Sequence, residues 1–263
     1  MRQGLVAVLL CVLVAGAGCS ALPGFGGGNG TSAGTPEGAT VDEVPGVEDG
    51  RLTNQSALLD AHVENITETG YAHTVDTNVT DARQGETVDL TQRQRTSVAA
   101  GAGEYRTQLI TDGATASRFI TWGNESVAVR RGETGGGDPQ YQSIPPREPD
   151  ALAGRALLDR RLSAEFEAVN VQQREDAPNV VTMEVDGLPE DNAVFDDRAQ
   201  ISNVREYNAQ LVVDTRGRIH SFDAVAIYDI EGESADYEFT FQMTSFEDPG
   251  VERPEWAAGD DGR

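Results

Sequence analysis

The sequence predicts an α+β fold in which one large antiparallel sheet carries two main helices on one face. Three observations lead to this prediction. Near the start of the folded part, apolar residues recur with the helical period at Leu59, Val63 and Ile66. Over residues 208–244, apolar and polar residues alternate with the period of 2 that is typical of half-buried strands. Between these regions, a leucine-rich stretch at 149–162 predicts the second helix.

The first nineteen residues have the order of an export signal. A charged start precedes an apolar run over residues 4–14 and a row of small residues that ends at Cys19. A cysteine in this place resembles a lipobox, which implies that the Cys19 thiol is lipidated and the signal removed. Gly16 stands where that pattern usually has leucine, so an ordinary secretory signal and an uncleaved anchor remain alternatives. The apolar run is shorter than the ~20 residues that a spanning helix needs.

The composition is strongly acidic and contains no lysine. The formal net charge is -24 at pH 7, and all 20 basic residues are arginine. Such a surface suits concentrated salt, because a Debye length of ~3 Å at 1 M screens the repulsion among carboxylates. We therefore predict a halophilic protein, with general acidity for solubility as the alternative. No basic stripe is present, so nucleic acid is excluded as an expected partner.

Composition also divides the chain. Residues 1–19 form the expected lipoprotein signal peptide. Residues 20–49 are rich in glycine, proline, threonine and acid, and predict a flexible tether before a single domain over 50–258 and an acidic tail over 259–263. Both cysteines lie in the leader, so the domain is expected to hold no disulfide. Five sequons make glycosylation candidates of Asn29, Asn54, Asn65, Asn78 and Asn124.

The elements follow in order from their patterns. The first helix, over about 55–68, begins at capping residues 53–56 and ends at Gly70. From Tyr71 the period changes to 2, and Pro149 later suits the first turn of the second helix. Residues 188–200 are acidic and irregular, with one short helical turn at most. The expected strands cover 71–79, 87–99, 104–111, 117–122, 126–131, 166–173, 180–185, 208–214, 219–230 and 238–244.

Several segments together resemble a haloarchaeal lipoprotein family of unknown function. They are the leader with its cysteine, SALLDAH at 56–62, Tyr71, the leucine-rich helix, and VERPEW at 251–256. The layout also looks like the lipoprotein carrier fold of bacteria, which is LolA-like and of the mycobacterial LppX and LprG type. That resemblance implies a strongly curved half-barrel sheet whose concave face carries the two helices over a hydrophobic cavity. The family has no assigned catalytic or binding residues to carry over.

No motif predicts catalysis or a metal site. His62, His73 and His220 fall on separate elements without metal-ligand spacing, so we expect satisfied imidazoles that serve packing. The sequence has no EF-hand loop, no Gly-x-Ser-x-Gly elbow and no phosphate-binding glycine loop after a strand. We therefore expect no enzyme, no metal and no cofactor.

The apolar face of the sheet remains as the candidate binding surface. It could line a cavity for a lipid or another apolar ligand, or it could be a filled core, since a wall and a core have the same period. The candidate residues are Tyr71, Val75, Tyr105, Leu109, Leu211, Val213, Val225, Ile227, Phe239, Phe241 and Met243.

These observations predict a lipoprotein on the outer face of the cytoplasmic membrane, held by lipid on Cys19 and binding or carrying an apolar ligand. Without lipidation the protein would be secreted. The alternative is a non-catalytic module of the cell envelope, with a solid core, that contacts another protein through its polar faces. The two helices would be lids under the first hypothesis and core-packing elements under the second.

Overall fold

The computed structural model describes residues 41–258, except for residues 84–85, 114, 189–193, 196–200 and 231. The predicted signal peptide with Cys19, the candidate Asn29 and the acidic tail lie outside these described residues. Within them, every helix is too short or too polar to cross a membrane.

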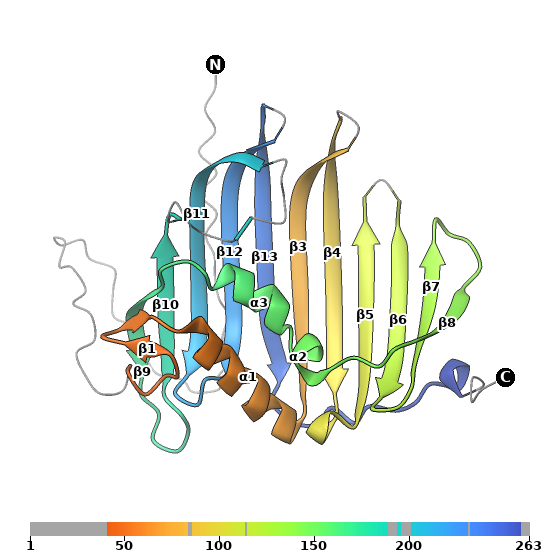
Figure 1. Cartoon of the computed structure of the whole chain (residues 1–263), viewed down its shortest axis with the longest axis horizontal. Helices are drawn as coiled ribbons and strands as arrows, with labels where there is room; N and C mark the ends of the chain where they lie inside the picture. Colours follow the sequence, from red (N-terminus) through yellow and green to blue (C-terminus); the bar gives the residue numbers. More distant parts are fainter. Residues whose placement is uncertain are drawn as a thin grey trace, which may run out of the picture. The chain divides into compact units, whose positions relative to one another are not determined.

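The described residues form one open antiparallel sheet, which confirms the predicted fold class (Figure 1). The strand order is β1-β2-β9-β10-β11-β12-β13-β3-β4-β5-β6-β7-β8. The last strand, β13, therefore lies in the middle of the sheet, between β12 and β3. The strands are β1 (Val47–Glu48), β2 (Arg51–Leu52), β3 (Tyr71–Arg83), β4 (Glu86–Val98), β5 (Glu104–Asp112), β6 (Ser117–Asn124), β7 (Ala128–Thr134), β8 (Gln140–Ile144), β9 (Glu167–Gln172), β10 (Val180–Asp186), β11 (Ile201–Asp214), β12 (Ile219–Ile230) and β13 (Glu233–Ser245).

Helices α1 (Gln55–Thr69), α2 (Pro149–Leu152) and α3 (Arg155–Arg161) lie on one face, which we call the helix-side face (Figure 1). Helix α1 begins at Asn54, whose Oδ1 accepts a hydrogen bond from Ala57 N at 3.1 Å. The second predicted helix is divided, because Gly154 adopts a left-handed conformation with φ 77° between α2 and α3. Two short 3-10 helices complete the fold, η1 (Ala100–Ala102) and η2 (Glu255–Ala257).

The folded domain begins earlier than the composition predicts. Val41, Val44 and Val47 are only 1–4 % exposed and belong to the main hydrophobic core, and β1 joins the sheet. The carbonyl oxygen of Gly46 accepts hydrogen bonds from the backbone of Thr53 and Asn54, which fixes this segment against the start of α1. The prediction of a tether through residue 49 is therefore wrong for residues 41–49. The average composition of this segment is polar, but three regularly spaced valines within it are enough to join the core.

The main core lies between the helices and the strands from β9 to β3. Helix α1 contributes Leu58, Leu59 and Ile66, which are fully buried. The strands supply large apolar side chains. The Phe222 ring contacts those of Phe166 and Phe239, and the Phe241 ring separately contacts that of His62. This half of the helix-side face is filled by protein side chains, and we call it the covered half.

Strand β12 corrects one part of the predicted inward face. Val225 is 45 % exposed, and Ile227 shares its face, so both point away from the helices. The buried residues of this stretch are Ala224 and Ala226. Apolar residues occupy both faces here, and the small alanines lie inward because large rings such as that of Tyr237 lie opposite them.

A second, smaller cluster lies on the other face of the sheet. Trp122 and Val129 pack there with Ala257 of η2, and Trp256 covers their edge. The guanidinium of Arg253 lies over the Trp122 ring, 4.9 Å from its centroid. The closing segment 251–256 therefore attaches the C-terminal end of the chain to β6 and β7.

Candidate functional site

Most of the predicted cavity-lining residues lie in the covered half. Their side chains are between 0 and 6 % exposed and contact one another or the helices. Leu109 is only half-buried, and Ile227 faces the opposite side. Tyr105 is buried on β5, outside the covered half. The residues of the covered half are Tyr71, Val75, Leu211, Val213, Phe239, Phe241 and Met243.

Two histidines are enclosed in this core. His73 stacks on Tyr71 with ring centroids 5.9 Å apart, and its ring lies 5.0 Å from that of Phe241. His62 reaches the other side of Phe241, and its Nδ1 accepts a hydrogen bond from Ile219 N at 3.1 Å. Within the described residues, neither ring nitrogen of His73 has a hydrogen-bond partner. The expectation of a satisfied imidazole is therefore wrong for His73.

The enclosure sets the charge of both rings. Burial, together with the smaller effect of the neighbouring His73, lowers the pKa of His62 to about 3. Burial alone lowers the pKa of His73 to about 4. Both side chains are neutral at pH 7, and their surroundings are those of a packed core.

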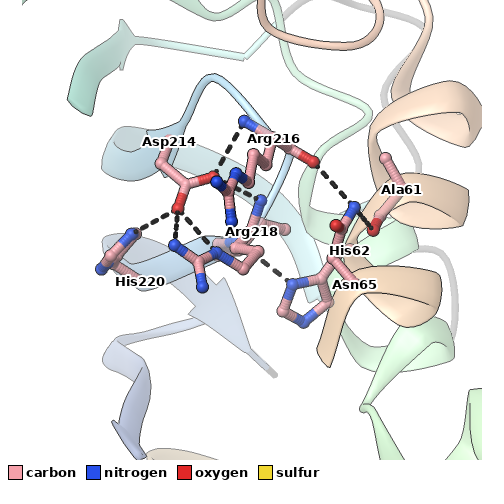
Figure 2. Close-up of polar contacts among 8 residues, drawn as sticks. Ala61, His62, Asn65, Asp214, Arg216, Arg218 and His220 are labelled. Carbon is pink, nitrogen blue, oxygen red and sulfur yellow. Dashed lines mark hydrogen bonds and ion pairs between the residues drawn. The ribbon is translucent and has the colours of Figure 1, made fainter. Parts of the chain in front are cut away.

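A third histidine belongs to a polar cluster at the turn between β11 and β12 (Figure 2). The carboxylate of Asp214 is 1 % exposed and accepts hydrogen bonds from Arg216 N, Arg218 N and Arg218 Nε at 2.8–3.1 Å. His220 Nε2 lies 3.2 Å from the same carboxylate. Burial acts to raise the pKa of Asp214, but the hydrogen bonds from His220 and Arg218 outweigh it and hold the pKa below its usual value.

This cluster fixes α1 to the hairpin of β11 and β12. Asn65 Nδ2 donates to Ala61 O at 2.8 Å within the helix and to Arg216 O at 3.0 Å across the contact (Figure 2). Gly217 has φ 83°, and a Cβ added there would lie 2.7 Å from the Ala61 Cβ. The Asp214 cluster is therefore a docking contact between helix and sheet. The sequence analysis missed it, although the short pattern from Asp214 to His220 could have indicated a charged turn.

The described glycosylation candidates already use their side chains. Asn54 and Asn124 accept backbone hydrogen bonds through Oδ1, as a helix cap and in a turn. Asn78 Nδ2 donates to Glu238, on the face away from the helices. Asn65 Nδ2 makes both contacts described above, so a glycan on Asn65 would disturb the docking of α1.

Beyond the core, the helix-side face continues across β4–β8, and we call this part the open half. In the described residues, α1, α2 and α3 lie over the strands from about β10 to β4, and no helix lies over β5–β8 (Figure 1). Cross-strand pairing defines three rows of residues here. The first row is Val98, Tyr105, Gly123, Ala128 and Ile144; the second is Thr96, Thr107, Thr121, Arg130 and Gln142; the third is Gln94, Leu109, Phe119, Gly132 and Gln140.

The open half differs in chemistry from the covered half. Its three rows contain hydroxyls, amides and one arginine but no carboxylate. Most of the first row and the threonines of the second row are buried. In the third row Leu109 and Phe119 are only partly buried, so apolar surface remains accessible beside the amides of Gln94 and Gln140. This combination of accessible apolar surface and uncharged or cationic polar groups can accommodate an amphiphilic molecule.

One segment crosses the open half. Residues 145–149, which we call the strap, connect β8 to α2 across β5–β7 (Figure 1). Arg147 N donates to Tyr105 Oη at 3.0 Å, which attaches the strap to β5. Gly123 is required beneath it, because a Cβ there would lie 2.5 Å from Tyr105 Oη. The strap thus holds Arg147 above the first and second rows.

Comparisons with known proteins give the following. No protein-family model and no curated protein matches the chain. A DUF1329 family protein from Desulfovibrio piger is 9% identical with a TM-score of 0.27, over 74% of this chain and 94% of that one. A putative outer membrane lipoprotein-sorting protein domain from Vibrio parahaemolyticus is 10% identical with a TM-score of 0.24, over 74% and 93% of the two chains. Structural similarity this low gives no information on the function of this chain.

Proposed function

We propose that this protein is a binding protein for an elongated amphiphilic ligand, such as a lipid, on the open half of its helix-side face. The proposal rests on a difference in burial and polarity between two parts of the same sheet face. Helices fill the face from β9 to β3, whereas across β4–β8 Leu109 and Phe119 stay partly exposed in a row that also contains glutamine amides. A surface with both characters suits a ligand with both characters.

The third row gives the ligand a path. It runs from Phe119 through Leu109 and Gln94, and the pairing continues to Val75 on β3 and Phe241 on β13. The accessible apolar residues of the open half are thus separated from the core of the covered half by one polar side chain, that of Gln94. An acyl chain lying along this row would exchange water for apolar contact at about 25 cal/mol per Å² of buried surface.

Helices α2 and α3 are the part of the cover best suited to move. Gly154 separates them, and the strap that precedes them carries Pro145 and Pro146. Their attachment is both polar and apolar. Arg161 lies over the Phe239 ring at 3.6 Å from its centroid and donates to Tyr237 Oη at 2.9 Å, while Leu152 and Leu158 are buried in the main core. Displacing these helices would lengthen the apolar path toward Phe239 without breaking the sheet.

A second function, an envelope module that binds another protein, is favoured by the filled core of the covered half. Seven of the predicted cavity residues are buried there by protein side chains alone. Under this alternative the helices are packing elements and a bound apolar molecule is not expected.

The location of the protein is part of the same proposal. Lipid on Cys19 would hold the domain at the outer face of the cytoplasmic membrane, and two long chains at ~0.8 kcal/mol per buried methylene make a lasting anchor. In this position the binding face would meet lipid or its carriers. Labelling of the wild-type chain, but not of Cys19→Ser, with a radioactive lipid precursor would support the anchor.

The ligand proposal is tested with a neutral apolar probe. The full-length chain is titrated with 1-N-phenylnaphthylamine, whose fluorescence rises in apolar surroundings, and Leu109→Gln is compared with Ile110→Gln. The two residues are neighbours on β5 and face opposite sides of the sheet. Losing about 1 kcal/mol of apolar contact at Leu109 should weaken binding about fivefold.

Ile110→Gln should change the affinity less than twofold. Equal effects of the two substitutions, or no saturable binding by the wild-type chain, would contradict the proposal and favour the protein-binding alternative.

A further inference from the structure

Two arginines of the open half have no acidic partner. Acidic residues outnumber basic ones by 44 to 20 over the whole chain, yet only some of the described arginines lie beside a carboxylate. Within the described residues, Arg130 on β7 and Arg147 on the strap pair with none, and nothing acidic acts on the charge of Arg147 except the phenol of Tyr105. Arginines that do pair are Arg51, Arg93, Arg131, Arg155, Arg205 and Arg218.

The two guanidinium groups are also close enough to repel each other. Burial lowers the pKa of Arg147, and Arg130 lowers it further against the opposing effect of Tyr105. Arginine stays charged in proteins, so Arg147 is a partly buried cation whose charge is opposed by that of Arg130. Such an arrangement is unfavourable by itself and becomes favourable when an anion lies between the cations.

The surroundings provide a frame for that anion. Arg130 stands in the second row beside Thr121 and Thr107, which are 2 and 5 % exposed. The Arg130 guanidinium lies 5.8 Å from the centroid of the Phe119 ring in the third row. Arg147 approaches from the strap, whose backbone is held by Tyr105. Arg130 thus lies beside two buried threonines and the partly exposed Phe119, and the strap attaches Arg147 to the neighbouring strand β5.

We infer that Arg130 and Arg147 bind the anionic head group, a phosphate or a carboxylate, of an amphiphile whose chain lies along Leu109 and Phe119. This inference rests on the proposed function and names the class of its ligand. Guanidinium groups match the oxygens of phosphate and carboxylate through paired hydrogen bonds, and such contacts are about twice as strong as neutral ones. The head group would then lie over Thr107 and Thr121, and the chain would follow the third row toward the core.

Displacement of 1-N-phenylnaphthylamine from the full-length chain tests the inference. The competitors are n-dodecyl phosphate, n-dodecanol and inorganic phosphate, which separate the head group, the chain and the free anion. The variants are Arg130→Gln and Arg147→Gln. Arg95→Gln is the matched control, because it removes the same charge from the opposite face of β4. Circular dichroism confirms that all three variants are folded.

We expect either site variant to weaken dodecyl phosphate about tenfold or more, and to leave dodecanol and the probe within twofold. Arg95→Gln should leave every competitor unchanged. Equal loss in Arg95→Gln and the site variants would overturn the inference, because the effect would then come from net charge.

Two further outcomes separate the inference from the proposed function. Unchanged dodecyl phosphate binding in both site variants would overturn the head-group site while the probe still confirms an apolar ligand. Inorganic phosphate that binds the site as tightly as dodecyl phosphate would also overturn it, since the site would then recognise a free anion. Failure of the wild-type chain to bind the probe at all would instead contradict the proposed function.

Discussion

At the scale of single residues, His73 is a buried polar side chain without a hydrogen-bond partner in the described part of the chain. Its imidazole is enclosed between Tyr71 and Phe241 without a hydrogen-bond partner for either nitrogen. In the unfolded chain the same ring has a pKa of about 6.5. Because the folded state lowers this pKa, the unfolded state binds more protons below pH 6.5, and folding becomes less stable as the pH falls.

We therefore predict that the free energy of unfolding is constant above about pH 7 and decreases below pH 6.5. His62 and His73 each contribute up to ~1.4 kcal/mol per pH unit until the pH approaches their folded pKa values. Urea unfolding between pH 4 and 8 measures this slope. His73→Leu keeps a similar volume and should reduce the slope by about half; an unchanged slope in this variant would contradict the assignment.

At the scale of elements, α1 joins the sheet through a polar contact at one end and an apolar face along its length. Asp214 orders the turn of the β11–β12 hairpin, and Arg216 in that turn accepts the Asn65 side chain of α1. The Asp214 carboxylate therefore does not bond to α1 itself, but it fixes the conformation of the turn that α1 contacts.

Asp214→Asn should lower the free energy of unfolding by about 3 kcal/mol, because it leaves the half-buried Arg218 guanidinium without its counter-charge. Amide hydrogen exchange in α1 should accelerate as well, since the docking turn loosens. Asp223→Asn is the control: burial raises the pKa of Asp223, so its charge is not required, and the change should stay within about 0.5 kcal/mol. Similar losses in both variants would argue against a docking role.

The elements that sequence predicted best are those with one clear period. Helix α1 begins and ends near the expected caps, Asn54 and Gly70, and the meander of β11–β13 agrees with the alternating pattern. Periodicity fails where both faces are apolar, as at Val225 and Ile227, because the size of residues on neighbouring strands then decides which face is buried.

The candidate site was harder to predict than the sheet. The alternation in β5 predicts Tyr105 and Leu109 as inward residues, whereas no pattern in the sequence predicts Arg130 and Arg147 as residues of the site. Arg147 lies on a segment without regular structure, and its position relative to Arg130 depends on how the strap crosses three strands. Buried Phe195 was missed for the same reason, since it packs on Tyr207 and Tyr237 from an irregular segment.

At the scale of the whole molecule, net charge governs stability in solution. The formal charge of -24 makes the compact state repel itself in dilute buffer. Ion pairs on the surface, such as Arg51–Glu167 at 2.5 Å, are individually weak because both partners are mostly exposed.

We predict that the urea midpoint of unfolding rises when the sodium chloride concentration is increased from 0.05 M to about 1 M. Higher salt concentrations should have less effect, because the Debye length is already ~3 Å at 1 M. Chloride is preferred to sulfate in this test, because sulfate stabilises most proteins by exclusion from their surface. A midpoint that is flat or falls with salt would contradict the prediction of salt adaptation.

The central position of β13 has a consequence for the order in which the protein is made. The chain reaches β13 only after every other strand has been synthesised, and its partners on β3 lie 160 positions earlier, as Asn78 and Glu238 show. Until residue 245 has emerged, β3 and β12 each expose an unpaired edge, and contacts this distant in sequence form slowly. We therefore expect β13 to complete the sheet in a late step of folding, by joining two halves that fold separately before it.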